Sequence, residues 1–121
     1  ISERAVNNLF TAAGSSDFFW VFTGMFGGDA WSHTDAYLKH SPATYAEQIE
    51  TPLLIMHSEN DLRCNVEQAE HLFVRMRLLG KDVELIRFTD ESHELSRSGS
   101  PIHRVMRFEL ILDWLGRYLR D

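Results

Sequence analysis

The clearest pattern in the chain lies in its second half, where two apolar runs alternate with two segments of helical periodicity. The first run, residues 53–56, is introduced by Pro52 and is closed by the polar residues 58–61. Continuous apolarity is typical of a strand buried on both faces, as in a parallel sheet covered by helices. Residues 83–88 predict a second strand, whose mixed pattern indicates that it is partly covered on both faces.

Each predicted strand is followed by a predicted helix. The first helix is expected to begin at Asn65 as N-cap, with Gln68 completing a capping box, and to end before Gly80. Its apolar face is Val66, Ala69, Leu72, Phe73, Met76 and Leu79. The second helix is expected to open at Pro101. Its stripe is Val105, Phe108, Ile111, Leu112, Leu115, Tyr118 and Leu119. The order strand, helix, strand, helix predicts an α/β fold with right-handed crossovers.

Residues 1–50 show no strand alternation and are interpreted as short helices and loops. Their aromatic segment, residues 18–22, has two interpretations: a core surface, or the wall of an apolar substrate pocket. Two strands are too few for a parallel sheet that stands alone. We therefore expect the edge of a larger sheet, trimmed from a longer protein, that associates with copies of itself through the surface that missing strands would cover.

Composition excludes several classes of function. The net charge is −6, and the twelve basic residues are scattered, which argues against binding to nucleic acid. No run approaches the ~18 apolar residues of a membrane span, and the N-terminus lacks the apolar core of a signal peptide. The single cysteine, Cys64, is compatible with a reducing compartment. A soluble, cytoplasmic protein is the expectation.

Candidate chemistry follows the two predicted strands. Asp61 comes shortly after the first strand and His93 shortly after the second, so both are expected at the carboxyl rim of the sheet. There the carboxylate would orient the imidazole, which would act as general base and then as general acid. The plainer interpretations are a turn or capping role for Asp61 and a solvated loop position for His93.

The nucleophile of such a site is missing, because no G-x-S-x-G motif occurs in the chain. Cys64 stands at the start of a helix, where either a lowered thiol pKa or a simple space-filling role is possible. The remaining histidines have no metal-ligand spacing. They are His33, His40, His57, His71 and His103. We expect neither a metal site nor a cofactor.

A family resemblance rests on several of these segments. It is carried by residues 51–64 (TPLLIMHSENDLRC), 68–70 (QAE), 80–81 (GK) and 92–99 (SHELSRSG), together with Ser41-Pro42, Tyr45 and Ile49. They resemble the C-terminal end of a prolyl-oligopeptidase-type serine peptidase, most of all the acylaminoacyl-peptidase branch. The resemblance extends through residues 41–121 and is looser over residues 1–40.

The resemblance implies a parent protein with a β-propeller and an α/β-hydrolase domain that hydrolyses short, often N-acylated peptides. It assigns Asp61 as the triad acid and His93 as the triad base. Residues 1–121 would be a C-terminal fragment of one catalytic domain, with a helical segment at 1–50 and the βαβα end of the sheet at 51–121. This fragment is expected to be inactive alone. An esterase fragment and a non-enzymatic association module remain the alternatives.

Overall fold

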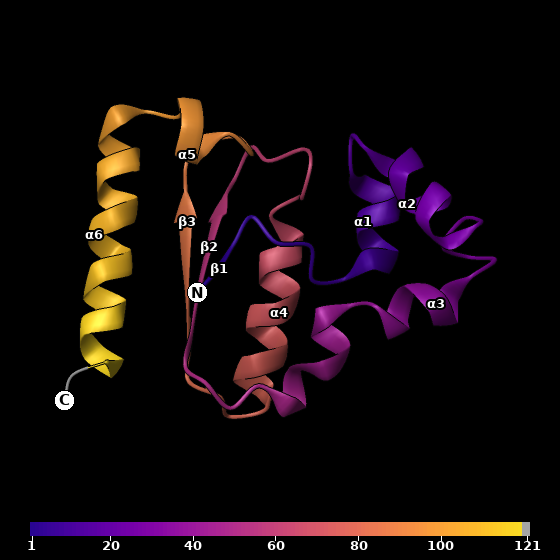
Figure 1. Ribbon diagram of the computed structural model, residues 1–121, viewed down its shortest axis with the longest axis horizontal. Coiled ribbons are helices and arrows are strands. Elements are labelled where there is room, and N and C mark those ends of the chain that lie inside the picture. The colour runs from indigo at the N-terminus through magenta and orange to yellow at the C-terminus, as the bar shows by residue number, and fades with distance from the viewer. Residues whose placement is uncertain (120–121) are drawn as a thin grey trace.

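The computed structural model describes residues 1–119, which fold around a three-stranded parallel sheet (Figure 1). The elements are β1 (Ser2–Glu3), α1 (Leu9–Ser15), α2 (Phe19–Phe26), α3 (Thr34–Lys39), the 3-10 helix η1 (Pro42–Gln48), β2 (Leu53–Ser58), α4 (Glu67–Leu78), β3 (Val83–Phe88), α5 (Leu95–Ser98) and α6 (Pro101–Tyr118). Helix α6 covers one face of the sheet and α4 the other, while α1 to α3 lie beyond α4 (Figure 1). The predicted α/β order of residues 51–119 is confirmed.

Strand β2 is the centre of the sheet and is buried on both faces, as its continuous apolarity predicted. Ile55 packs in the cluster under α4, and Leu54 and Met56 pack in the cluster under α6. The register pairs Leu53 with Val83 and Ser58 with Phe88, so both strands end at the same level. This shared ending brings the loops that follow β2 and β3 to one rim.

The capping box predicted for the first helix is wrong, whereas its predicted end is confirmed. Val66 is the N-cap of α4, and the buried Oδ1 of Asn65 has no hydrogen-bond partner among the described residues. At the other end Gly80 adopts φ +68°, and the N–H of Lys81 donates to the carbonyl of Met76. This is a Schellman motif, in which glycine adopts a left-handed conformation without steric cost.

Helix α6 begins at Pro101 as predicted, but most of its predicted apolar stripe does not pack on the sheet. Trp114 is buried against the sheet, with Leu110 and Ile111 beside it. The rest of the stripe is exposed, namely Val105, Phe108, Leu112, Leu115, Tyr118 and Leu119. Apolar residues on two sides of a helix are typical of one that is covered on both sides.

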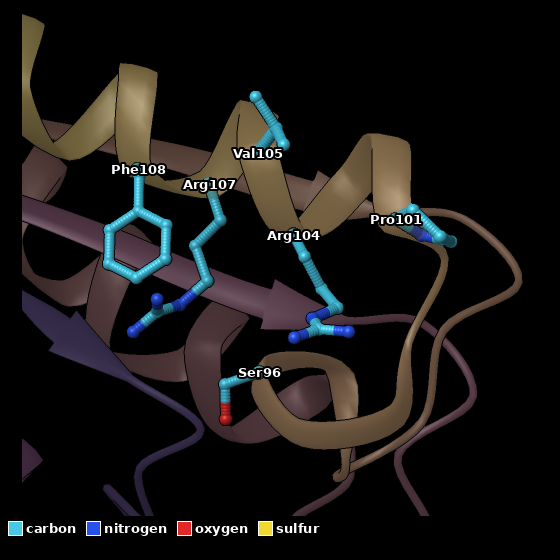
Figure 2. A pocket seen from close by; sticks show the side chains of 6 residues that line it. All are labelled: Ser96, Pro101, Arg104, Val105, Arg107 and Phe108. Atoms are coloured by element: carbon cyan, nitrogen blue, oxygen red, sulfur yellow. The ribbon is translucent and has the colours of Figure 1, made fainter.

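A groove of about 390 Å³ lies along the N-terminal half of α6. It is lined by Ser96, Pro101, Arg104, Val105, Arg107 and Phe108 (Figure 2). Arg107 lies over the Phe108 ring, and its Nη2 donates to the Glu3 carboxylate of β1 at 2.6 Å. The α6 face therefore combines apolar surface with an arginine that is anchored to the sheet.

No helix within residues 1–119 is both long enough and apolar enough to cross a membrane.

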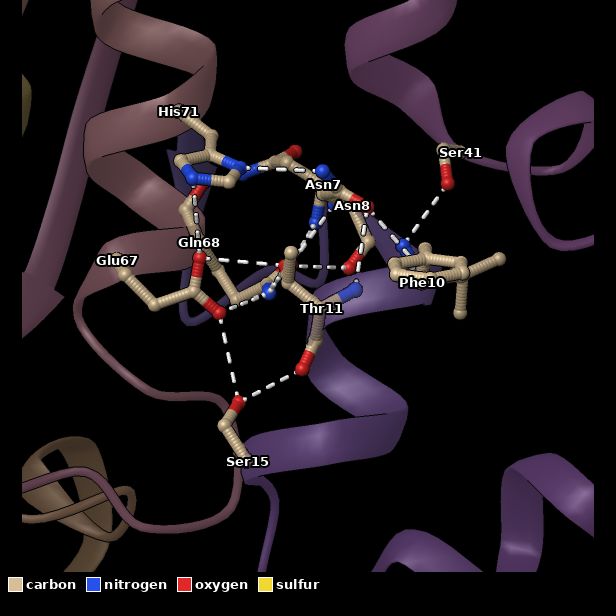
Figure 3. Close-up of polar contacts among 10 residues, drawn as sticks. Asn7, Asn8, Phe10, Thr11, Ser15, Ser41, Glu67, Gln68 and His71 are labelled. Atoms are coloured by element: carbon tan, nitrogen blue, oxygen red, sulfur yellow. Dashed lines mark hydrogen bonds and ion pairs between the residues drawn. The ribbon is translucent and has the colours of Figure 1, made fainter. Parts of the chain in front are cut away.

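Two features of the N-terminal segment differ from the sequence-based expectation. Residues 2–3 form a strand, β1, which pairs in parallel with β2 although no strand was expected before residue 51. Gln68 does not cap its own helix but is fully buried, and its Oε1 accepts the backbone N–H groups of Asn7 and Asn8 at 3.0 and 2.8 Å (Figure 3). Its Nε2 donates to the hydroxyl of Thr11. One glutamine thus joins the start of α1 to α4.

Candidate active site

Asp61 lies in the turn that follows β2 and is 1% exposed. Its Oδ1 accepts the backbone N–H groups of Arg63 and Cys64 at 2.9 and 2.8 Å. These two bonds fix the carboxylate plane and compensate part of the cost of burying a charged group. The turn or capping role considered for Asp61 therefore accounts for only one of its two oxygens, Oδ1. The other, Oδ2, is free to contact a side chain.

His93 supplies that side chain. Its Nδ1 lies 2.8 Å from Asp61 Oδ2, and its ring is 26% exposed while Asp61 is enclosed. An ionised carboxylate only accepts hydrogen bonds, so Nδ1 must carry the proton. A neutral ring in this tautomer has an unprotonated Nε2, which is the nitrogen that can accept a proton from a hydroxyl group.

The loops that carry this pair are hydrogen-bonded to one another through their main chains. The N–H of Glu59 donates to the carbonyl of Phe88, and the N–H of Asn60 donates to the carbonyl of Glu91, both at 2.9 Å. These bonds continue the parallel pairing of β2 and β3 beyond the last paired residues. Asp61 and His93 therefore meet because the sheet holds both loops in register.

A second imidazole, that of His57, faces Asp61 from β2. Its Nε2 lies 2.6 Å from the carbonyl oxygen of Cys64 and 3.5 Å from Asp61 Oδ2. Since a carbonyl only accepts, Nε2 is protonated and places a buried N–H beside the carboxylate. His57 was not among the residues predicted for this site; in the sequence it stood only among the histidines without metal-ligand spacing. Its position four residues before Asp61, at the end of a buried strand, is the signal that could have identified it.

Cys64 fills space at the start of the segment that leads into α4. Its side chain is buried, and burial, together with the charge of Asp61, raises the pKa of the thiol to about 11. A thiol with a raised pKa is protonated near neutral pH and is a poor nucleophile. The structure therefore supports the space-filling interpretation over a reactive cysteine.

Arg4 makes a further contact that holds the His93 loop in place. Its Nη1 donates to the main-chain carbonyl of His93 at 2.8 Å. Arg4 directly follows β1 and adopts φ +52°, a left-handed conformation that is uncommon outside glycine. Nothing local in the sequence indicated this contact, because 89 residues separate the two partners.

A cavity of about 250 Å³ opens beside the exposed edge of His93. It is lined by Asp17, Asn60, Leu62, Arg63, Ser92, His93 and Glu94. Arg63 bonds to Asp17 at 2.6 Å and lies over the ring of Phe18, while the N–H of Asp17 donates to the carbonyl of Leu62. Asp17, the residue directly before the aromatic segment, therefore forms part of the wall of the cavity beside the candidate base.

The core interpretation of the aromatic segment holds for only part of it. Phe22 is buried in the cluster formed by α1 to α3. Phe19 and Trp20 are more than half exposed, with Trp20 edge-on to both Phe18 and Phe19. None of residues 18–22 lines the cavity at His93, so the pocket-wall alternative stays a prediction.

Comparisons with known proteins identify the family and the fold. The model of the prolyl oligopeptidase family matches residues 1–121. The chain is 39% identical over 120 residues to the uncharacterized peptidase YuxL of Bacillus subtilis, an alignment that covers 98% of the chain and 18% of the relative.

Solved structures give the same result. The uncomplexed acylaminoacyl peptidase of Pyrococcus horikoshii superposes with a TM-score of 0.90 at 32% identity, over 98% of this chain and 20% of that one. An acylaminoacyl peptidase in complex with Z-Gly-Gly-Phe-chloromethyl ketone superposes at 0.87 with 32% identity, over 94% and 19%. The chain thus spans about a fifth of the length of the proteins that it matches.

Proposed function

The chain belongs to the prolyl oligopeptidase family of serine peptidases, and from this premise we propose that it carries the acid and the base of a Ser-Asp-His triad. The observation that supports this role is the 2.8 Å contact between Asp61 Oδ2 and His93 Nδ1, with Asp61 Oδ1 held by two backbone N–H groups. The serine and the oxyanion-hole donor that follows it would come from another part of one catalytic domain.

Each step of the proposed reaction uses an atom of the site. His93 Nε2 takes the hydroxyl proton of the serine as its oxygen bonds to the substrate carbonyl carbon, and Asp61 stabilises the resulting imidazolium. The imidazolium then gives its proton to the leaving amine as the carbon–nitrogen bond breaks, which leaves an acyl-enzyme. Water then hydrolyses the acyl-enzyme. His93 takes a proton from the attacking water and gives it to the serine oxygen as the bond between that oxygen and the acyl carbon breaks and the acid product forms.

We propose short or N-acylated peptides as the substrates. Two structural relatives are named acylaminoacyl peptidases, and one of them was crystallised with a Z-blocked tripeptide chloromethyl ketone. The cavity beside His93, whose lining includes Leu62, offers room for a substrate side chain. Location in the cytoplasm is part of the proposal, since the one cysteine is a free, buried thiol.

The test compares two preparations on three chromogenic substrates: an N-acetyl-aminoacyl anilide, the matching free aminoacyl anilide and a simple acyl ester. The longer peptidase that carries this chain should prefer the N-acetyl anilide. The 121-residue chain alone should hydrolyse none, because it has no positioned nucleophile. Preference of the longer protein for the ester would favour the esterase alternative, and His93-dependent turnover by the short chain would refute the proposed division of the triad.

We also propose that the 121-residue chain associates with copies of itself through surface that the missing part of the domain would cover, and that the outer face of α6 belongs to that surface. Leu112 is 67% exposed and Leu119 72%, and burying such side chains in a partner removes apolar surface from water. Sedimentation velocity should show oligomers that Leu112→Lys weakens. Leu78→Lys on α4, where the leucine is 80% exposed, is the matched control and should leave the oligomer intact. A compact monomer at every concentration would contradict this proposal.

A further inference from the structure

A second carboxylate–imidazole pair lies next to the first. Glu91 precedes His93 by two residues, and its side chain is 8% exposed. Its Oε1 lies 2.7 Å from Nδ1 of His103 on α6 and accepts the backbone N–H of Ser100 at 2.9 Å. Because the carboxylate accepts, Nδ1 of His103 is the donor in either charge state of the ring. The proposed triad does not use this pair.

The side chain of Glu91 joins its loop to the N-terminus of α6 by hydrogen bonds. Ser100 is the N-cap residue of α6, and its own side chain makes no capping hydrogen bond. Glu91 therefore supplies a negative charge from outside the helix, at the end where unsatisfied N–H groups favour anions. His103, one turn into α6, is held between this carboxylate and an edge-on contact with Phe88 at the end of β3.

The main chain of Glu91 is fastened to the loop of the triad acid. Its carbonyl accepts the N–H of Asn60, the residue before Asp61. Asp90, directly before it, adopts φ +60°, so the chain reverses direction at this point. One residue thus connects α6, through its side chain, with the Asp61 turn, through its main chain.

Packing around the carboxylate leaves it little room to move. A Cβ built on Gly99 would lie 2.5 Å from Glu91 Oε2 and 2.7 Å from the carbonyl oxygen of Leu95. Gly99 has φ −67°, which any residue can adopt, so this glycine is required by close approach and not by backbone conformation. The loop from Glu91 to Ser100 is closed around the carboxylate.

We infer that Glu91, paired with His103, is a positioning residue that sets the placement of His93 against Asp61. The inference rests on the proposed function, since it concerns the base of the proposed triad. Glu91 touches neither the candidate base nor a reacting atom. It acts by fixing the main chain two residues before His93, while Arg4 fixes the carbonyl of His93 itself.

The expected consequence is a loss in turnover rather than in substrate binding. Without the Glu91 carboxylate the loop is released from α6, and His93 no longer stays at hydrogen-bond distance from Asp61. A displacement of about 1 Å in a catalytic group can lower the rate about 100-fold. Glu91→Ala in the longer peptidase should therefore lower kcat about 10- to 100-fold and leave KM almost unchanged.

The matched set of variants is Glu91→Gln, Gly99→Ala and Gly116→Ala. Glutamine keeps an acceptor oxygen and the shape of the side chain, so it should restore most of the kcat lost in Glu91→Ala. Gly99→Ala leaves Glu91 chemically intact but crowds both its carboxylate and the backbone of Leu95, so it should shift the loop and lower kcat. Gly116→Ala is the control, because a Cβ at this position of α6 meets nothing within 4 Å.

A spectroscopic readout separates this inference from the proposed function. The proton between His93 Nδ1 and Asp61 Oδ2 should give a downfield proton NMR signal in the longer protein, assigned by its loss in His93→Ala. Glu91→Ala and Gly99→Ala should weaken or abolish it, and Glu91→Gln and Gly116→Ala should keep it. This signal requires no turnover, so a protein without peptidase activity whose signal still depends on Glu91 refutes the proposed function and supports the positioning role.

An unchanged NMR signal together with unchanged kcat in a folded Glu91→Ala protein overturns the inference. If Glu91→Ala does not fold, an unchanged NMR signal together with unchanged kcat in a folded Gly99→Ala protein overturns the inference. A rise in KM at constant kcat also overturns it, because Glu91 would then act on substrate binding.

Discussion

Replacing His93 with alanine in the longer peptidase is expected to lower kcat/KM about a million-fold, the largest effect that we predict. The variant loses the group that accepts the serine proton and later protonates the leaving amine. The buried Asp61 carboxylate would remain without its imidazole partner. Steady-state kinetics on an N-acetyl-aminoacyl anilide, with circular dichroism to confirm that the variant is folded, measures this loss.

The control for this experiment is His33→Ala. His33 precedes α3, is exposed, and makes no side-chain cap to that helix. Its replacement should leave kcat/KM within about twofold of wild type, because surface substitutions away from structured contacts have small effects. Activity near the wild-type level in His93→Ala would show that the base of the reaction is another residue.

Replacing Asp61 with asparagine is expected to lower kcat about ten-thousand-fold while the fold is retained. Asparagine has nearly the same shape, and its oxygen can still accept the N–H groups of Arg63 and Cys64. Its amide would then donate toward His93 Nδ1, which moves the ring proton to Nε2 and removes the free electron pair needed by a base. The measurement is kcat, with circular dichroism to confirm that the variant is folded.

Asp90→Asn is the matched control for Asp61→Asn. Asp90 lies in the loop of His93, is exposed, and adopts φ +60°, a conformation that asparagine tolerates well. This variant makes the same chemical change three residues from His93 and should keep wild-type kcat. An equal loss in both variants would mean that the general charge of the rim matters, rather than the specific bond between Asp61 and His93.

The parts of the molecule that could be predicted depend on short-range patterns. The continuous apolarity of β2 predicted burial on both faces, and Gly80 predicted the end of α4, because strand burial and helix capping are determined within a few residues. Asp61 and His93 could be chosen because each follows a strand and parallel strands end at one rim. The sequence therefore pointed to the two side chains that the structure brings to 2.8 Å from one another.

The features that were missed depend on contacts between distant residues. The amide of Gln68 binds backbone groups 60 and 61 residues away, so its apparent place in a local capping box was misleading. Arg4 reaches His93, and Glu91 reaches His103, through geometry that exists only after the sheet has formed. The packing predicted for the apolar stripe of α6 was mostly wrong for a related reason. Periodicity reveals the apolar faces of a helix but does not say which of them packs on the sheet.

The pairing of β1 with β2 has a consequence for how the molecule forms. The unit β2–α4–β3 consists of neighbours in sequence and can assemble early, whereas β1 must find a strand more than fifty residues away. Contacts between distant residues form slowly because the loop must close before they contribute. Arg4 follows β1 directly, so the last tether on His93 becomes available only when this pairing is complete. Within residues 1–119, β1 and Arg4 are therefore expected to be among the last parts to take their places, and the site is complete only when they do.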